Sequence, residues 1–175
     1  NARRTATETF QFPFGYIFGY NSFADSYSVQ QSYYGGTLVS TNTATYSLPG
    51  NLKFVQVTGG EILYGAFSNC AKIETIVLPT NITAIGEQAF YNCLGLKSVN
   101  VPQSVTSIGD DAFMGTGLTN VVLPQGLVSI GEYAYSQCTS LTSLYIPGTV
   151  QEIGRDAFNT CLNLTQVTMA EGIPY

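Results

Sequence analysis

Hydrophobic and polar positions recur along this chain with a period of about 23 residues, and this period is the main evidence for its fold. The chain contains five copies of this pattern, and all five keep the same order of residue types. Repeats of this length predict a solenoid, in which each repeat is one supersecondary unit stacked on its neighbours. The clearest copy runs Ile85-Gly86, Ala89-Phe90, Cys93, Leu96, Val99, Val101-Pro102. The other copies begin at Ile62, Ile108, Ile130 and Ile153.

Within one repeat, the spacing of apolar residues changes from three to two. Phe90, Cys93, Leu96 and Val99 are three residues apart, whereas Val101 follows Val99 by two. Spacing near three is typical of a 3₁₀ or helical turn, and spacing of two is typical of a strand. We therefore expect one such turn per repeat, then a short strand paired in parallel with the next repeat. Six strand segments are predicted, beginning at Leu52, Ile73, Leu96, Leu118, Leu141 and Leu164.

After the strand and its proline, the chain is expected to return along the opposite side of the solenoid. The glycine of each Ile-Gly pair should permit either a positive φ or a close approach of two backbones. The aromatic residue that follows should stack with its equivalents in a column along the core. That column consists of Phe67, Phe90, Phe113, Tyr135 and Phe158. Inward-facing residues of the return segment are Ile82, Val105, Leu127 and Val150.

Four cysteines share one repeat position, three residues after the aromatic: Cys70, Cys93, Cys138 and Cys161. The third copy is one residue shorter and has Gly115-Thr116-Gly117 there. We interpret the cysteines as small hydrophobic residues that fill the core. Disulfides between neighbours, 70 with 93 and 138 with 161, are the alternative, although the parallel Cβ vectors would give poor bridge geometry. A zinc site is disfavoured because the chain has no His and no C-x₂-C pair.

The first fifty residues have a different pattern. Every second residue from Phe10 to Tyr20 is aromatic, which predicts a strand with one aromatic face. This face is expected to cover the open end of the first repeat, and a platform for stacking sugars is the alternative. Residues 21–45 are interpreted as a polar loop. We thus assign residues 1–45 to an N-terminal segment that caps or links to the solenoid, and residues 46–175 to the solenoid.

Composition and charge exclude several classes of function. Charged residues make up 10% of the chain, and the net charge is -5. Nucleic-acid binding is not expected, because it requires clustered Lys and Arg that this chain lacks. No apolar run is long enough to span a membrane, and the polar residues 1–9 do not form a signal peptide. Because no polar cap closes the last repeat, we expect the chain to be a fragment or mature piece of a longer protein.

Little in the sequence supports catalysis. The chain has no His, which removes the usual general base and the His-containing catalytic triads. An acidic column follows the repeat glycines, and we interpret it as a complement to the positive end of a helical turn. Weak Ca²⁺ binding and a glycosidase-like carboxylate pair are the alternatives. We expect no enzyme activity, no cofactor and no metal. The column consists of Glu87, Asp110 and Glu132, with Asp111 and Asp156 one place later.

The outward positions of the strands form the candidate binding surface. They are nearly free of charge and include isolated aromatic and apolar residues. Such a face suits contact with a protein or a glycan better than catalysis. A solvated sheet with scattered apolar residues is the alternative interpretation. The predicted binding residues are Phe54, Gln56, Val77, Asn100, Val122, Tyr145 and Thr168.

Over residues 52–169, the motif Ile-Gly-x-x-Ala-Phe-x-x-Cys-x-x-Leu-x-x-Val-x-Val-Pro resembles the BspA-like leucine-rich repeat family. Residues 13–19 and 52–60 also resemble the linking segments between repeat blocks of such proteins. The resemblance implies a curved, right-handed solenoid of about six repeats with its parallel strands on the concave side. The chain departs from the family pattern in the missing cysteine of the third copy and in the missing proline after Met169.

Members of this family are typically bacterial or protist surface proteins linked to adhesion and protein binding. The resemblance therefore implies a non-enzymatic, cell-surface or secreted module that binds proteins or glycans on host or neighbouring cells through the concave sheet. One alternative is a structural spacer in a larger surface protein. Another is a carbohydrate-binding accessory module.

Overall fold

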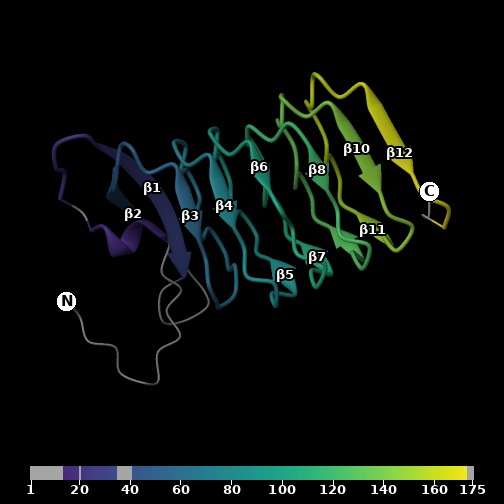
Figure 1. The fold of residues 1–175 in the computed structure, drawn as a ribbon, viewed down its shortest axis with the longest axis horizontal. Coiled ribbons are helices and arrows are strands. Elements are labelled where there is room, and N and C mark those ends of the chain that lie inside the picture. Colours follow the sequence, from purple (N-terminus) through teal and green to yellow (C-terminus); the bar gives the residue numbers. More distant parts are fainter. Residues whose placement is uncertain (1–13, 20, 35–40, 173–175) are drawn as a thin grey trace.

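The computed structural model of the protein describes residues 14–19, 21–34 and 41–172, and its main part is a solenoid of stacked repeats with parallel strands (Figure 1). Two columns of short strands run along the stack. The first column consists of β3 (Phe54–Gln56), β4 (Thr75–Val77), β6 (Ser98–Val99), β8 (Val121–Val122), β10 (Ser143–Ile146) and β12 (Gln166–Met169). The second consists of β5 (Ala84–Ile85), β7 (Ser107–Ile108), β9 (Ser129–Ile130) and β11 (Glu152–Ile153).

The predicted parallel pairing of successive repeats is confirmed, with one interruption in the first column. Strands β3, β4 and β6 form one three-stranded sheet, and β8, β10 and β12 form another. The break falls at the third copy, the one shortened by a residue. There the backbone link is a long hydrogen bond, 3.4 Å, from the N–H of Thr119 to the carbonyl of Lys97. The shortened repeat therefore shifts the strand ends without breaking the stack.

The segment between the two columns consists of hydrogen-bonded turns. The N–H of Ala89 bonds to the carbonyl three residues earlier, the tight-turn geometry that the spacing of three predicts. Other N–H groups reach the following repeat, as from Phe90 to the carbonyl of Ala112 (2.8 Å). Neighbouring repeats are thus tied together here as well as by the strands. Two positions in each repeat have a positive φ. The first position is occupied by Gly65, Gln88, Asp111, Tyr133 and Asp156, and the second by Asn69, Asn92, Gly115, Gln137 and Thr160.

The core follows the predicted columns. The aromatic rings stack face to face from Phe67 to Phe158, with centroids 5.0 to 5.5 Å apart and planes within 12°. The inward residues of the return segments, listed above, are buried. Of the two roles considered for the repeat glycines, close approach is the one observed. A Cβ on Gly86 would lie 2.5 Å from the backbone carbon of Leu63, and Gly86 is not among the residues with positive φ.

An antiparallel hairpin covers the N-terminal end of the solenoid. It consists of β1 (Ser26–Tyr34) and β2 (Thr41–Pro49), so the interpretation of residues 21–45 as a polar loop is wrong. The hairpin has the alternation of a half-buried strand pair, but the buried position Gln31 is polar and conceals that pattern. The division between residues 1–45 and 46–175 remains a prediction, and β2 extends across it. Side chains facing the core are Tyr27, Val29, Gln31, Ala44, Tyr46 and Leu48.

The aromatic stretch from Phe10 to Tyr20 contains a short 3₁₀ helix, η1 (Phe14–Ile17), so the predicted strand is wrong over these residues. Residues 10–13 and 20 lie outside the described residues. The ring of Phe14 packs 5.0 Å from that of Phe67 and extends the aromatic column by one member. Its N–H also donates to the carbonyl of Ala66 (2.7 Å). Phe14 therefore packs against the first repeat, and Phe18 packs edge-on against Phe14.

Candidate functional site

The outward side of the first strand column, which we call the strand face, carries all the predicted binding residues. Along β10, Tyr145 points outward while Leu144 and Ile146 are buried, as the alternation of a strand requires. All seven predicted side chains are exposed. Among the hydrophobic and aromatic ones, the most exposed are Phe54 (55%) and Val122 (61%). The strand face is formed by Phe54, Gln56, Thr75, Val77, Ser98, Asn100, Asn120, Val122, Ser143, Tyr145, Gln166 and Thr168.

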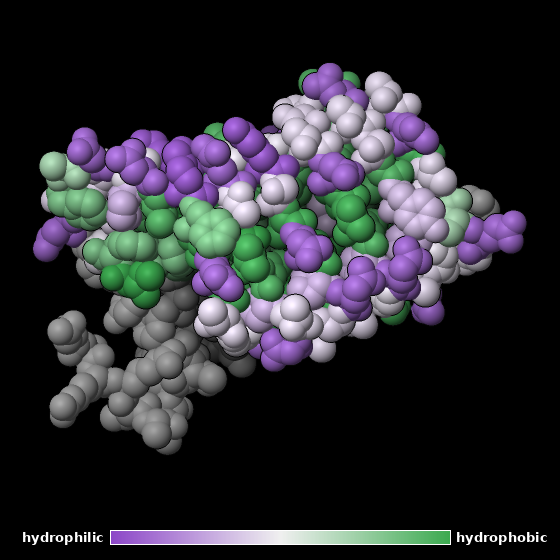
Figure 2. Space-filling model, viewed as in Figure 1, coloured by the Kyte–Doolittle hydropathy of each residue, from purple (hydrophilic) through white to green (hydrophobic). Residues whose placement is uncertain are grey.

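Hydrophobic residues form a band along this face. Figure 2 shows the band running along the solenoid between borders of more hydrophilic residues. Within it, Val122 on β8 pairs in register with Tyr145 on β10, which pairs in turn with Thr168 on β12. The apolar and aromatic positions of different repeats are therefore placed side by side by the strand register.

Two shallow depressions lie on the strand face, one on each side of Val122. The first, of about 320 Å³, lies between β4, β6 and β8, and Val77, Asn100 and Val122 are among its lining residues. The second has a volume of about 280 Å³, and Val122, Tyr145 and Thr168 are among its lining residues. Gln56 borders a separate hollow beside Phe14. Phe54 lines none of the three. The structure thus brings five of the seven predicted residues together around Val122.

The alternation of strand residues did not predict one polar residue of the second depression, Gln125. Gln125 lines it but follows Pro124 and lies outside the strand, where the alternating pattern gives no indication of direction. Asn120, Ser143 and Gln166 complete its polar lining. The amides and hydroxyls of these residues are uncharged, so the depression combines hydrogen-bonding groups with one aromatic ring.

Charges on this side gather at the edge where the strands begin. Glu74 accepts ion pairs from Lys53 (3.2 Å) and from Lys97 (3.8 Å). The three side chains are 42 to 68% exposed, so each pair contributes little to stability. Lys97 also lines the first depression, whereas no charged residue lines the second. The two depressions therefore differ in electrostatic character.

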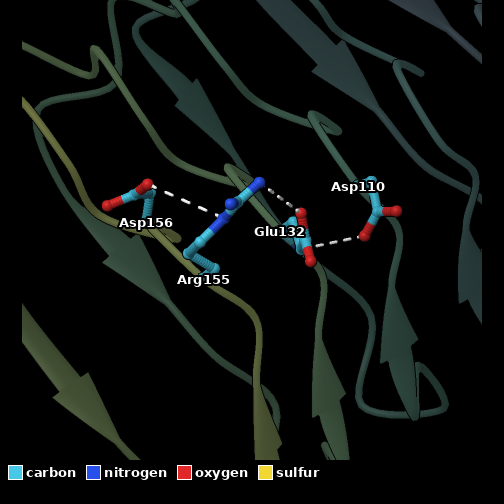
Figure 3. A network of polar contacts seen from close by, with 4 residues as sticks. All are labelled: Asp110, Glu132, Arg155 and Asp156. Atoms are coloured by element: carbon cyan, nitrogen blue, oxygen red, sulfur yellow. Dashed lines mark hydrogen bonds and ion pairs between the residues drawn. The ribbon is translucent and has the colours of Figure 1, made fainter.

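The acidic column lies beside the second strand column and forms pairs rather than a converging site (Figure 3). The Oδ1 atom of Asp110 accepts a hydrogen bond from the N–H of Glu132 (2.8 Å). Glu132 in turn lies 3.4 Å from the guanidinium of Arg155, which also faces Asp156 at 4.0 Å. These contacts connect carboxylates of successive repeats through one cation and one amide.

The suggested role of these acids at the positive end of a helical turn stays a prediction. The N–H groups of Gln88 and Asp111 donate to carbonyls of the next repeat, whereas that of Glu132 donates to the carboxylate of Asp110. Partial burial, followed by the negative charges of Asp110 and Asp111, raises the pKa of Glu87. Burial likewise raises the pKa of Asp111, although a hydrogen bond from Gln88 opposes the shift. These carboxyls therefore repel one another.

A groove of about 610 Å³ runs past this column, and its lining includes Asp110, Glu132 and Glu152. In the described part of the chain, no group of three or more His, Cys, Asp or Glu side chains is close enough to hold a metal ion. Neither does any described helix have the length and apolar character needed to cross a membrane. The acidic groove thus has the residue types of a cation site without their convergence.

The four cysteines are free thiols in the interior, and the last of them is only partly buried. The Sγ of Cys93 donates to the carbonyl of Phe67 (3.0 Å), and Cys138 and Cys161 make the equivalent bonds at 3.2 Å. Burial raises the pKa of Cys93 to about 12 and that of Cys138 to about 11. The alternative of disulfides between neighbours is not observed. The spacing placed these residues in the core but gave no indication of their hydrogen bonds.

Comparison with solved structures finds other leucine-rich repeat proteins. A Treponema pallidum protein of this class is 33% identical, with a TM-score of 0.60; the alignment covers 61% of this chain and 50% of that one. One from Bacteroides ovatus is 28% identical, with a TM-score of 0.59 and coverage of 96% and 41%. A leucine-rich cell surface protein from Faecalibacterium prausnitzii is 23% identical, with a TM-score of 0.65 and coverage of 84% and 40%. The chain thus spans half or less of each relative's length.

Comparison with curated proteins gives no match. The model of the BspA type leucine-rich repeat region, in contrast, matches residues 60–175 with six copies. The matched part contains the aromatics stacked from Phe67 to Phe158, the cysteine position and both strand columns except β3. The chain therefore belongs to the BspA-type leucine-rich repeat family.

Proposed function

We propose that the protein is a non-enzymatic interaction module that binds proteins or glycans on host or neighbouring cells through the strand face. The observation that carries this proposal is the row of exposed side chains Phe54, Val77, Val122 and Tyr145 on an almost uncharged sheet. Exposed apolar residues gathered on one face, with depressions between them, are typical of interaction surfaces. Membership of the family supports the same class of function.

A location at the cell surface or outside the cell forms part of this proposal. Among the structural relatives, the Faecalibacterium prausnitzii protein is named as a cell surface protein. Binding of macromolecules through an open sheet also requires a face that partners can reach, and the strand face is covered by no other described element.

The absence of enzyme activity is proposed from the chemistry of the residues. Catalysis by two carboxylates requires a pair converging on the substrate with different pKa values. Here Glu132 is engaged by Arg155, and Asp110 is engaged by a backbone N–H. The chain has no His to act as a general base.

The proposal is tested by measuring binding of the chain to an array of extracellular-matrix proteins and glycans. A Val122→Asp/Tyr145→Asp double variant places two charges in the centre of the strand face. A Leu94→Asp/Leu162→Asp double variant is the matched control, because these leucines are 65% and 76% exposed and lie in turns outside that face. Thermal melting of both variants verifies that they fold.

Binding that is lost in the first variant and kept in the control supports the strand face as the interaction surface. Equal binding by both variants would place the interaction elsewhere on the molecule. No binding by the folded parent protein would contradict the proposal and favour a structural spacer.

A further inference from the structure

We infer that the depression around Tyr145 is a subsite for a neutral oligosaccharide. This inference rests on the proposed function, since it assigns a ligand class to one part of the strand face. It depends on three properties of the depression: a rigid aromatic ring, a ring of unpaired polar side chains, and the absence of charge.

The aromatic ring is held in place by the strand that carries it. Tyr145 lies on β10 between Val122 of β8 and Thr168 of β12, with which it is in register. The residues on either side, Leu144 and Ile146, are buried in the core and fix the strand. The residue as a whole is 44% exposed. A tyrosine ring offers a broad apolar face with a polar tip, which suits packing against the C–H groups of a sugar ring.

The polar side chains around this ring are free of intramolecular partners. Among the described residues, the side chains of Asn120, Gln125, Ser143, Gln166 and Thr168 make no hydrogen bond. Their amides and hydroxyls together provide both donors and acceptors. Sugar hydroxyls also donate and accept, so these groups match a carbohydrate in kind.

Some polar side chains outside this depression are instead engaged in the stack. The hydroxyl of Ser104 donates to the carbonyl of Ile82 (2.6 Å), and that of Thr149 donates to the carbonyl of Leu127 (2.7 Å). Each bond connects a repeat to the one before it. The side chains around Tyr145 have no such structural role in the described chain, which leaves their polar groups available to a ligand.

Charge and size favour a neutral sugar over other occupants. No charged residue lines this depression, so an anionic glycan or an acidic peptide would find no counter-charge there. Its volume of about 280 Å³ is at the low end for ligand sites, enough for about one or two sugar rings. A globular protein partner would instead require contact over a much larger area of the strand face.

The test is binding of the whole chain to an array of neutral oligosaccharides, their sulfated counterparts and extracellular-matrix proteins, followed by titration calorimetry with the best neutral ligand. Tyr145→Ala is expected to weaken binding about tenfold, which is the loss of one aromatic contact. Tyr145→Phe should retain most of the affinity. Phe23→Ala removes a similarly exposed aromatic (48%) that lies outside the strand face, and it should leave affinity unchanged.

A second variant covers the case in which Tyr145→Ala fails to fold. Asn120→Ala/Gln166→Ala removes exposed side chains only, and it should also weaken binding of the neutral ligand. Binding to matrix proteins with no binding to neutral glycans would overturn the inference and leave the proposed function standing. Preference for sulfated ligands, or glycan binding unaffected by the variants at Tyr145, Asn120 and Gln166, would also overturn it. Binding to nothing on the array would contradict both proposals.

Discussion

The thiol of Cys93 donates a hydrogen bond to the carbonyl oxygen of Phe67, 3.0 Å away in the preceding repeat. The contact joins the two most regular core columns, the cysteines and the aromatics, across a repeat boundary. It explains why a thiol suits a position that an apolar residue of similar size would also fill. In the third copy, the hydroxyl of Thr116 bonds to a carbonyl within its own repeat and lies 3.1 Å from the Sγ of Cys138.

Replacement of Cys93 by Ala should therefore reduce the free energy of unfolding by about 1 to 3 kcal/mol. The change removes a buried sulfur and leaves the Phe67 carbonyl without its thiol partner. Urea denaturation followed by circular dichroism measures the effect. Leu94→Ala is the control, because that neighbouring side chain is exposed and should contribute within about 0.5 kcal/mol. Equal effects of the two substitutions would show that the thiol contact is unimportant.

Replacement of Tyr135 by phenylalanine should stabilise the folded protein. Its ring continues the aromatic column, but its hydroxyl is buried with no hydrogen-bond partner. Burial of that unpaired hydroxyl also raises the pKa of Tyr135. We expect Tyr135→Phe to increase the free energy of unfolding by about 1 kcal/mol, since the buried polar group is removed with little change in shape.

Chemical denaturation of the Tyr135→Phe variant, compared with the parent chain, measures this gain. Tyr133→Phe is the control, since that side chain is only partly buried. A loss of stability in Tyr135→Phe would mean that the hydroxyl has a partner, such as a buried water.

The sequence predicts those parts of the fold that repeat an apolar pattern over several copies. Because the aromatics and cysteines recur at fixed spacing, their stacking could be derived from the period alone. The second strand column was missed, since strands of two residues such as Ala84–Ile85 are too short to show an alternation. The positive φ of Gln88 and Tyr133 was missed as well, because neither residue type indicates that conformation.

The candidate site, like the fold, could be predicted from the sequence only in part. The outward direction of Tyr145 follows from strand alternation, so the strand face could be predicted. Which residues share a depression depends on the register between repeats, and the shortened third copy changes the strand ends there. The pairing of Glu132 with Arg155 also depends on side-chain conformations that spacing does not determine.

The cost of removing an aromatic should depend on its position in the stack. Phe113 is fully buried between Phe90 and Tyr135, so Phe113→Ala should cost about 3 to 5 kcal/mol. Phe158 is only partly buried and contacts one described ring, that of Tyr135. Phe158→Ala should cost clearly less. Denaturation of both variants makes the comparison, and similar losses would argue against the nearest-neighbour description of the stack.

Alkaline pH should destabilise the protein through its buried thiols. An unfolded chain ionises Cys93 near its ordinary pKa of 9.0, whereas burial raises the pKa of the folded thiol to about 12. The stabilisation is therefore fully present below pH 9 and is lost as the pH rises from 9 towards 12. Within this window, each such thiol should lower the free energy of unfolding by about 1.4 kcal/mol per pH unit.

Denaturation curves recorded across that range, for the parent chain and for Cys93→Ala, isolate the contribution of this thiol. The variant should show a shallower loss of stability with pH. Parallel curves would mean that Cys93 ionises alike in the folded and unfolded chains.

Gln31 should be essential for the attachment of the hairpin to the solenoid. Its side chain is fully buried; Oε1 accepts a hydrogen bond from the N–H of Gly15 (2.6 Å), and Nε2 donates to the carbonyl of Ser68 (2.8 Å). It also lies 3.5 Å from the Sγ of Cys70. One amide thus connects η1, β1 and the first repeat. Gln31→Ala leaves the Gly15 N–H and the Ser68 carbonyl unpaired, at a cost of about 1 to 3 kcal/mol for each buried group.

Because the stack is held together repeat by repeat, this loss should fall on the N-terminal end. Hydrogen exchange should become faster at the amides of β1 and β2, while amides between β8 and β12 keep their protection. Gln30→Ala, at the adjacent exposed position of β1, is the matched control and should leave exchange unchanged. If Gln31→Ala accelerated exchange no more than Gln30→Ala, the buried amide would not be what holds the hairpin on the first repeat.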